Sequence, residues 1–296
     1  MNNILTYRAL NLDKKTKLRA YLKREKQIST RFLISAGREG RIKVNGKEEK
    51  LNYMLSEGDI IEIELQREET QDIDPVFMEL DIIYEDKDIL IINKPPFIVV
   101  HPTKNYQTNT LSNGIIYYFR QKGEDTIVRL VSRLDMNTSG LIVVAKNQFT
   151  HMAMARDKAS FQKTYLAVVH NKMKEKEGLI DLPILKEEIG VKRIISPEGQ
   201  ESKTMYKVIE EYDNSSLIEL RLLTGRTHQI RVHLSHFGCP IYGDDLYGEA
   251  DEEYIKRQAL HAVKIEFSHP RTLERMKFEA TIPEDIKNLI NKLRRP

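Results

Sequence analysis

The pattern of hydrophobic and polar positions divides the chain into a short first part and a long second part. Near the end of the first part, apolar side chains alternate with glutamates, which predicts a half-buried strand over residues 60–65. Upstream, residues 18–27 and 30–36 have helical spacing, and Ser29 is a favourable N-cap for the second helix. Asn45-Gly46 separates two short extended runs and tolerates the positive φ angles of a tight hairpin. These signals together predict one compact unit.

A polar stretch over residues 66–75 is the best linker candidate, because it is mostly acidic and ends on a proline. After it, the strand-like runs are not separated by regular helices, which disfavours a doubly wound parallel sheet. We therefore predict an α+β fold, with a mixed or antiparallel β-sheet domain over residues 71–296 and a small α/β domain over residues 1–70. The expected strands are 81–84, 89–92, 141–145, 164–169, 217–222 and 263–267, and the expected helices are 110–121, 148–158, 227–237 and 283–293.

Composition narrows the class of protein without naming a reaction. Of the 296 residues, 40% are hydrophobic, which is enough for a sizeable core. The single cysteine, Cys239, excludes an internal disulfide framework and four-cysteine zinc sites, as in a reducing compartment. No apolar run reaches the length of a membrane span, and the first residues lack the order of a signal peptide. We expect a soluble, cytoplasmic protein without a membrane partner, for which a monomer suffices.

Positive charge is concentrated near the N-terminus, although the net charge of the chain is only +3. Residues 8–50 hold 14 Lys/Arg against 5 Asp/Glu, whereas residues 51–70 hold 1 against 6. A clustered basic patch is the usual footprint of a partner with a phosphate backbone. A solvated helix face would give the same count, so charge alone does not decide between the two.

The first segment that carries chemistry is residues 131–145. Arg133 and Asp135 precede the turn formers at 137–140, and a strongly apolar strand follows. An aspartate on a loop beside a core strand is held rigidly yet stays within reach of a substrate. The alternative for such a charged pair is a structural salt bridge at a turn.

A second segment opens the expected strand at 164–169. Lys163 and Tyr165 lie two positions apart, so in extended chain they share one face. A tyrosine offers a flat ring that can stack on a base and a hydroxyl that can carry a proton. The alternative is a tyrosine that simply packs over the sheet.

The third segment is residues 223–248, in which Thr224-Gly225 is expected to cap a helix that Gly238 ends. Spacing predicts a buried stripe of Ile230, Leu234 and Phe237, with His228, Arg231 and Ser235 on an adjoining face. Arg231 lies at the edge of the stripe, where its guanidinium can reach a partly buried carboxylate. Such an arginine would hold an aspartate ionised and fix its orientation.

Histidines in the third segment raise a metal hypothesis. The possible ligands are His228, His233, His236 and Cys239. On a helix the first two would point about 140° apart, given 3.6 residues per turn. No flanking carboxylate or second cysteine completes a usual zinc pattern, so we expect no metal site.

Taken together and in order, these segments resemble the RluA family of pseudouridine synthases. The family motif R-L-D-x-x-T-S-G stands at residues 133–140, K-x-Y at 163–165, and T-G-R-[TS]-H-Q-[IL]-R-x-H at 224–233. Asn93-Lys94-Pro95 with the following Val-Val-His-Pro, and Gly243-Asp244 with Tyr247-Gly248, resemble further family features. The family usually has histidine before R-L-D, where this chain has Ser132.

The N-terminal unit resembles an S4 RNA-binding domain, which many large-subunit rRNA synthases of this family carry. The resemblance implies a cofactor-free isomerase that converts uridines in structured RNA to pseudouridine, with rRNA favoured as the partner and tRNA as the alternative. It implies three catalytic residues: Asp135 as the carboxylate, Arg231 as its partner and Tyr165 as the stacking residue. Expected RNA or substrate contacts are Arg133, Lys163, Arg226 and His228.

Two other classes of protein would share much of this pattern. A non-catalytic RNA-binding or ribosome-assembly factor would keep the fold but lose site residues, whereas Asp135, Tyr165 and Arg231 are all present. A hydrolytic RNA or nucleoside glycosidase would also use a carboxylate, and it would release free uracil.

Overall fold

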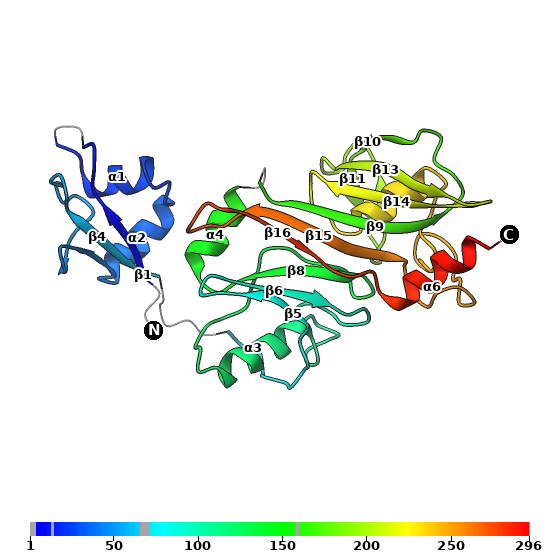
Figure 1. Ribbon diagram of the computed structural model, residues 1–296, viewed down its shortest axis with the longest axis horizontal. Coiled ribbons are helices and arrows are strands. Elements are labelled where there is room, and N and C mark those ends of the chain that lie inside the picture. Colours follow the sequence, from blue (N-terminus) through cyan, green and yellow to red (C-terminus); the bar gives the residue numbers. More distant parts are fainter. Residues whose placement is uncertain (1–3, 13–14, 66–70, 158–159, 296) are drawn as a thin grey trace.

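The computed structural model describes residues 4–12, 15–65, 71–157 and 160–295. A small sheet with two helices forms one unit, and a long sheet flanked by helices forms the other (Figure 1). The long sheet is mixed, because a single parallel strand pair interrupts antiparallel neighbours. This confirms the predicted α+β class with a sheet-dominated second part.

The small unit closes around its own core, in which Leu18, Phe32 and Ile63 are buried. Its second helix is capped as predicted, because the Ser29 side chain accepts the Phe32 N–H at 3.2 Å. The strand at the start of the chain was not predicted and forms the edge of the sheet. Sheet order is β1-β4-β2-β3. The elements are β1 (Ile4–Arg8), α1 (Leu18–Arg24), α2 (Thr30–Arg38), β2 (Ile42–Val44), β3 (Lys47–Glu48) and β4 (Ile60–Glu64).

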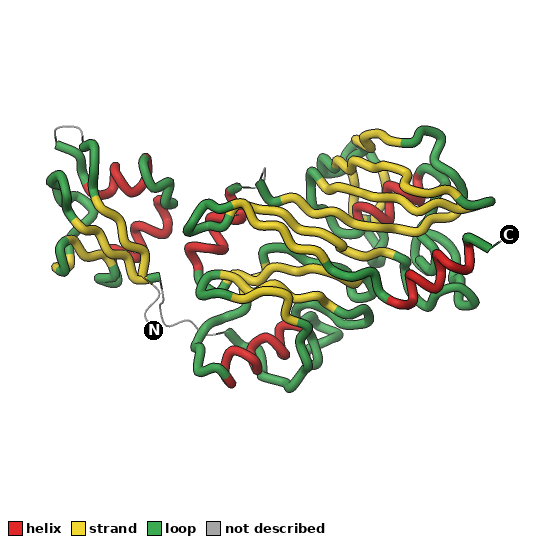
Figure 2. Tube along the Cα trace, in the orientation of Figure 1, coloured by secondary structure: helices red, strands yellow, loops and turns green. Residues whose placement is uncertain are grey.

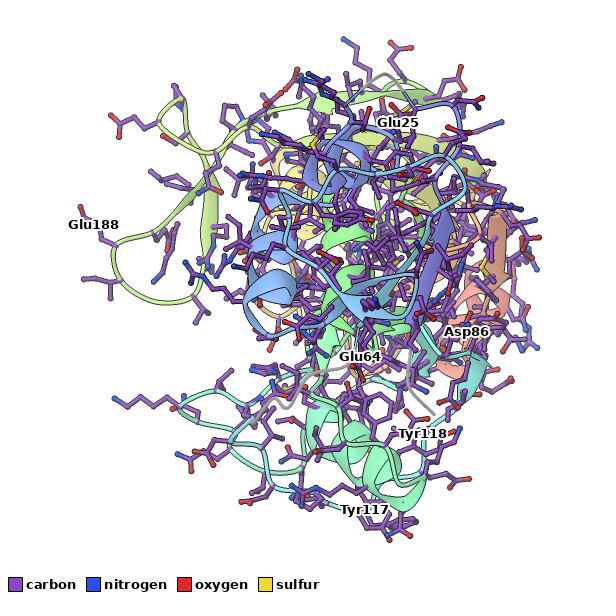
Figure 3. The ribbon with its side chains drawn as sticks, turned by 90° about the vertical axis from the view of Figure 1, so that its left-hand side faces the viewer. Glu25, Glu64, Asp86, Tyr117, Tyr118 and Glu188 are labelled. Carbon is purple, nitrogen blue, oxygen red and sulfur yellow. The ribbon has the colours of Figure 1, made fainter. Side chains whose placement is uncertain are left out.

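The long sheet has the order β10-β13-β14-β9-β15-β8-β6-β5, with β16 paired to β15 and β7 to β8 (Figure 2). A separate hairpin, β11-β12, projects from the body at the loop that Glu188 marks (Figure 3). The strands are β5 (Ile82–Glu85), β6 (Ile89–Lys94), β7 (Arg129–Leu130), β8 (Ser139–Ala145), β9 (Gln162–His170), β10 (Glu177–Asp181), β11 (Ile184–Lys186), β12 (Arg193–Ile195), β13 (Lys203–Glu211), β14 (Ser215–Leu222), β15 (Leu260–Ser268) and β16 (Arg275–Glu279).

Strand β8 runs through the middle of the molecule and is buried along its whole length. Ile142 and Val144 belong to the larger core on one face, and Leu141 and Val143 to a second core on the other. Burial on both faces explains the continuous apolar run in the sequence. The helices are α3 (Leu111–Gln121), α4 (Gln148–Arg156), α5 (Gln229–His236) and α6 (Glu284–Leu293).

Gly140 permits the parallel crossing of β8 and β15. Its φ is +114°, and a Cβ atom here would lie 2.3 Å from the carbonyl oxygen of Ala262. Any side chain would therefore push the two strands apart. Gly140, the last of the turn formers at 137–140, is therefore required for the pairing of β8 with β15.

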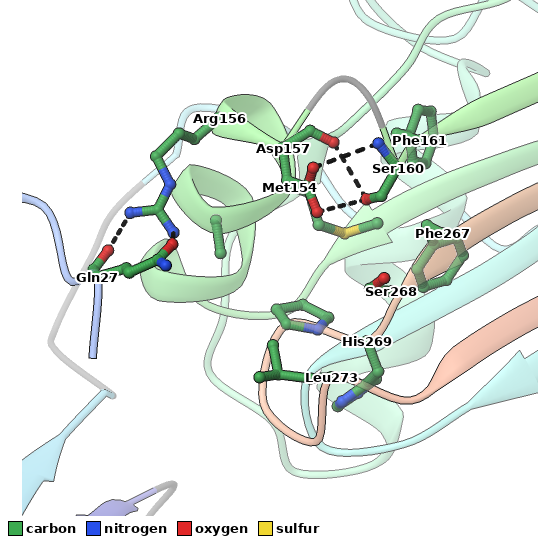
Figure 4. A pocket seen from close by; sticks show the side chains of 12 residues that line it. Gln27, Met154, Arg156, Asp157, Ser160, Phe161, Phe267, Ser268, His269 and Leu273 are labelled. Carbon is green, nitrogen blue, oxygen red and sulfur yellow. Dashed lines mark hydrogen bonds between the residues drawn. The ribbon is translucent and has the colours of Figure 1, made fainter. Parts of the chain in front are cut away.

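The two units touch beside α4. The ring of Phe149 joins the core of the small unit and meets Phe32 edge-on at 6.3 Å between ring centroids. Arg271 donates to both carboxylate oxygens of the buried Asp88 at 2.6 and 2.8 Å and to the carbonyl of Ile4 at 2.7 Å. A pocket opens at this contact, with Arg156 bonded to Gln27 on one side of it (Figure 4).

The expected linker over residues 66–75 needs correction in its second half. Residues 66–70 of the expected linker lie outside the described residues. Residues 71–75 are not a free linker, because Ile73 is buried in the larger core and the Gln71 side chain accepts the Val128 N–H at 2.9 Å. None of the helices in the described ranges contains a hydrophobic stretch that could span a bilayer.

Candidate active site

Asp135 lies in the loop of residues 131–138, between β7 and β8, which we call the Asp135 loop. Its side chain is 28% exposed, so the carboxylate is accessible but held. The Thr138 N–H donates to the Asp135 carbonyl at 3.1 Å and closes the turn ahead of β8. The carboxylate therefore lies on a loop that leads directly into the buried strand β8, as the sequence predicted.

Three side chains from other elements fasten the Asp135 loop. The Lys94 ammonium donates to the Met136 carbonyl at 2.9 Å, and Arg257 donates to the Asn137 carbonyl at 3.1 Å. The Gln258 amide donates to the Thr138 hydroxyl at 3.2 Å. Since these bonds reach three consecutive residues, the carboxylate just before them has little freedom to move.

Lys94 is fully buried and satisfies three carbonyls with one ammonium, the other two being Pro95 at 2.7 Å and Ile98 at 3.0 Å. Burial lowers the pKa of Lys94 to about 7, and the charge of Arg257 adds to this, while the charge of Asp135 opposes it. The ammonium is a brace that lies close to Asp135.

We expect Lys94→Met to lower kcat roughly 10- to 100-fold, because a loosened carboxylate spends less time in the productive position. The free energy of unfolding should fall by about 2–4 kcal/mol, since three carbonyls lose a donor. Single-turnover kinetics and urea denaturation measure both effects. Lys287→Met on the exposed face of α6 is the control and should change neither. An unchanged kcat in Lys94→Met would show that the brace does not hold the carboxylate.

Arg231 of α5 links Asp135 to a second carboxylate. Its Nη1 lies 3.3 Å from Asp135 Oδ2, while Nε and Nη2 donate to the two oxygens of Asp244 at 2.6 and 2.7 Å. Burial works against the guanidinium charge, but Asp244 and Asp135 more than offset it and raise the pKa of Arg231. Asp244 is fully buried, so this two-pronged contact fixes the plane of the guanidinium beside Asp135.

His228 also approaches Asp135, with its Nε2 3.9 Å from Oδ2. Its Nδ1 lies 2.9 Å from the Tyr247 hydroxyl, which itself accepts the Arg193 N–H at 2.8 Å. We assign the hydroxyl as donor to Nδ1, which leaves the ring proton on Nε2, facing Asp135. Burial lowers the pKa of His228 although the charge of Asp135 opposes this, so the neutral ring predominates at pH 7.

Tyr165 of β9 is 3% exposed and belongs to the larger core. Burial raises the pKa of its hydroxyl, and the negative charge of Asp135 raises it further. The phenol therefore stays protonated at neutral pH. Asp135, Arg231 and His228, all singled out from the sequence, are brought together, and the charge of Asp135 acts on the hydroxyl of Tyr165.

The remaining predicted contacts are Arg133, Arg226 and Lys163. Arg133 and Arg226 are exposed, and Arg226 donates to the Glu201 carbonyl at 3.1 Å. Lys163 holds its ammonium 5.8 Å from the ring centre of Phe161. Burial lowers the pKa of Lys163 to about 8.

Helix α5 begins later than predicted. Its N-cap is His228, with a left-handed φ of 58°, rather than Thr224-Gly225. The Gln229 side chain accepts the Thr224 hydroxyl and the Arg226 N–H, both at 2.9 Å, so the preceding residues form a turn. Phe237, predicted in the buried stripe, is 49% exposed because the helix ends at His236.

Histidines of the rejected metal hypothesis have other partners. His233 contacts the Thr204 hydroxyl at 2.9 Å and the Leu182 carbonyl at 3.0 Å, and Cys239 is buried. In the described part of the chain, Asp86, Asp88 and His269 form a group of three possible metal ligands that lie close together. The two carboxylates already have hydrogen-bond partners, because Asp86 contacts His269 and Asp88 accepts from Arg271.

Three residues of this site were not predicted as functional, namely Lys94, Asp244 and Tyr247. All three fall in segments noted for resemblance, but no periodicity marked them. At Ser132, which stands where the resembled family usually has histidine, the hydroxyl is buried without a hydrogen-bond partner among the described residues.

The arrangement defines a class of protein by its chemistry. A partly exposed carboxylate, held by a buried arginine, can act as nucleophile or base on a substrate that enters from solvent. The carboxylate lies on the loop that leads into β8, an inner strand of the long mixed sheet.

Comparisons with known proteins give the family. Residues 88–236 match the model of the RNA pseudouridylate synthase family, and the chain belongs to that family. It is 39% identical over 257 residues to an uncharacterized RNA pseudouridine synthase, YjbO, of Bacillus subtilis, covering 85% of this chain and 90% of YjbO. It is 37% identical over 255 residues to ribosomal large subunit pseudouridine synthase D of Haemophilus influenzae, covering 80% of this chain and 78% of that protein.

A solved structure supports the fold. Human RNA pseudouridylate synthase domain containing 4 is similar with a TM-score of 0.60 and 25% identity, covering 72% of this chain and 92% of that one. The chain is therefore a pseudouridine synthase, an isomerase that acts on RNA, as the sequence motifs predicted.

Proposed function

We propose that this chain isomerises uridines in large-subunit ribosomal RNA and that Asp135 is its catalytic carboxylate. The observation that carries the assignment is the contact of Asp135 with Arg231 beside the buried Tyr165. Several curated relatives, among them the protein of Haemophilus influenzae, are named as large-subunit rRNA synthases, which supports rRNA over tRNA. Ribosomal RNA as substrate would place the reaction in the cytoplasm, and one copy of the chain supplies the whole cluster.

The reaction breaks the N1–C1′ bond of uridine, turns the uracil and rejoins it through C5. The target nucleotide must first leave its stack to reach Asp135. The carboxylate then acts on the sugar or the base, while Arg231 holds it in one orientation. Tyr165 offers its ring to the free uracil between cleavage and rejoining. His228 presents a neutral N–H to the same space.

Among the expected RNA contacts, Arg133 and Arg226 fit the rim of the site, because both guanidinium groups are exposed. Arg133 shares the Asp135 loop, so it can bind a phosphate beside the target or fill the space that the uridine leaves. Lys163 stands two positions from Tyr165 on β9, and we keep it as a proposed contact to the backbone.

For residues 1–70 we propose an S4-like RNA-binding domain, with residues 71–296 as the catalytic domain. The small unit has two helices, a hairpin and its own core, and the basic excess of the chain falls within it. Arg31 and Arg38 are exposed on α2. Such a surface suits the phosphate backbone of a folded RNA.

The charge on α2 gives a direct prediction. Arg31→Ala/Arg38→Ala should weaken binding to a large-subunit rRNA fragment and reduce the salt slope, d log K/d log[salt], by about one per lost phosphate contact. Filter binding from low to high salt measures this. Lys277→Ala on β16, which is exposed and ion-paired with Glu279, is the control and should leave the slope unchanged. An identical slope in the double variant would remove α2 from the RNA interface.

The substrate assignment is tested by mapping pseudouridines at single-nucleotide resolution in a deletion strain and in the strain with the gene restored. Loss of specific sites from large-subunit rRNA, and their return, supports the proposal. Loss from tRNA alone would replace rRNA by tRNA. Unchanged modification together with defective ribosome assembly would favour the non-catalytic factor instead.

A further inference from the structure

Phe97 has a backbone conformation that is unusual for a bulky residue. Its φ is +65°, in the left-handed region that glycine enters freely and a phenylalanine enters only at a cost in energy. It lies in a turn directly after Pro95-Pro96. Strained positions of this kind persist when the surroundings hold them, and they gather at functional sites.

The ring of Phe97 is not explained by packing. The residue is 56% exposed, so it contributes little to either core of the long sheet. Any apolar residue could fill a surface turn, and glycine would do so without strain. An exposed aromatic ring at this position therefore suggests a ligand outside the protein.

The turn that carries Phe97 is built into the active site. The Lys94 ammonium donates to Pro95 and Ile98, one on each side of the turn, and also to Met136 in the Asp135 loop. Since one nitrogen lies within 3.0 Å of both the Ile98 and the Met136 carbonyls, the turn and the loop are neighbours. The same fully buried brace fixes the position of Phe97 and of the carboxylate.

We propose that Phe97 stacks on an unpaired nucleobase next to the target uridine, an inference that rests on the proposed function. When the target leaves its stack, the base beside it loses a stacking partner and exposes a flat face. A phenyl ring has no hydrogen-bonding group, so it accepts any unpaired base and favours the larger face of a purine. Phe97 thereby recognises an unpaired base beside a flipped-out target and does not read the identity of that base by hydrogen bonds.

The test compares Phe97→Gly, Phe97→Ala and Phe97→Tyr on an RNA fragment that wild type modifies. We expect KM to rise about tenfold in the glycine and alanine variants, the range of one lost base stack, with kcat within twofold. Tyrosine should keep the wild-type KM. The melting temperature of Phe97→Gly should also be roughly 1–3 °C above that of wild type, because glycine relieves the strain.

A spectroscopic arm and a control complete the experiment. With 2-aminopurine beside the target, wild type and Phe97→Tyr should quench its fluorescence on binding, and Phe97→Gly should not. Phe77→Ala, an exposed aromatic that contacts Tyr117 instead, should behave as wild type. A wild-type KM with full quenching in Phe97→Gly would overturn the stacking role, even if tritium release by the wild type had already upheld the proposed function.

Discussion

Asp135→Asn should lower the rate of pseudouridine formation by about 10⁴-fold or more, because an amide can neither attack carbon nor accept the proton. The fold should be unaffected. The carboxylate is 28% exposed, and Arg231 keeps its two stronger bonds to Asp244 when Asp135 is neutralised. Binding of the RNA fragment should stay within threefold of wild type.

Single-turnover assays with nucleoside analysis measure the rate, and thermal unfolding checks the fold. Asp213→Asn, an exposed aspartate in the turn between β13 and β14, is the matched control and should retain full activity. A folded Asp135→Asn protein that modifies RNA at near wild-type rates would contradict the site assignment.

Arg231→Ala should abolish turnover and also destabilise the protein by about 3–5 kcal/mol. The chemical loss follows because Asp135 loses the group that orients it. The structural loss follows because the fully buried Asp244 becomes an unpaired charge. Urea denaturation and single-turnover kinetics report the two losses separately.

A second substitution distinguishes these two roles of Arg231. In Arg231→Met/Asp244→Asn the buried charge is gone, and an amide oxygen remains to accept the backbone N–H groups of Leu246 and Tyr247. This double variant should recover most of the lost stability and none of the turnover. Recovery of activity with stability would mean that Arg231 only supports the fold.

The parts of the fold that the sequence predicts well are those where one physical signal dominates. Strand β8 was predicted from a continuous apolar run, which the structure buries at every position. Helix α2 was predicted because a serine caps an amphipathic run. The strands between β9 and β14, which include the separate hairpin β11-β12, have weaker patterns. In β13, apolar Met205 and Ile209 are exposed, so alternation there does not report burial.

The site itself was half predictable. Asp135, Arg231 and Tyr165 stood in motifs whose order indicated a shared function. Asp244 could not be assigned, because its partnership with Arg231 depends on how the chain returns after α5. Lys94 was equally hidden, since a buried lysine that binds carbonyls of distant segments leaves no periodic trace.

The start of α5 shows where local signals compete. Thr224 and Gly225 have the composition of a cap, yet the Gln229 side chain bonds to Thr224 and Arg226 and delays the helix. This delay leaves His228 at the N-cap, where it faces Asp135. The error in the predicted start of this helix therefore concerns His228, a residue of the site.

Tritium release from large-subunit rRNA labelled at C5 of uridine tests the central claim most directly, because only rejoining through C5 expels that hydrogen. Wild type should release tritium in a one-to-one ratio with pseudouridine formed and without free uracil, and Asp135→Asn should release none above background. Free uracil without tritium release would identify a glycosidase, and release by Asp135→Asn at the wild-type rate would contradict the account.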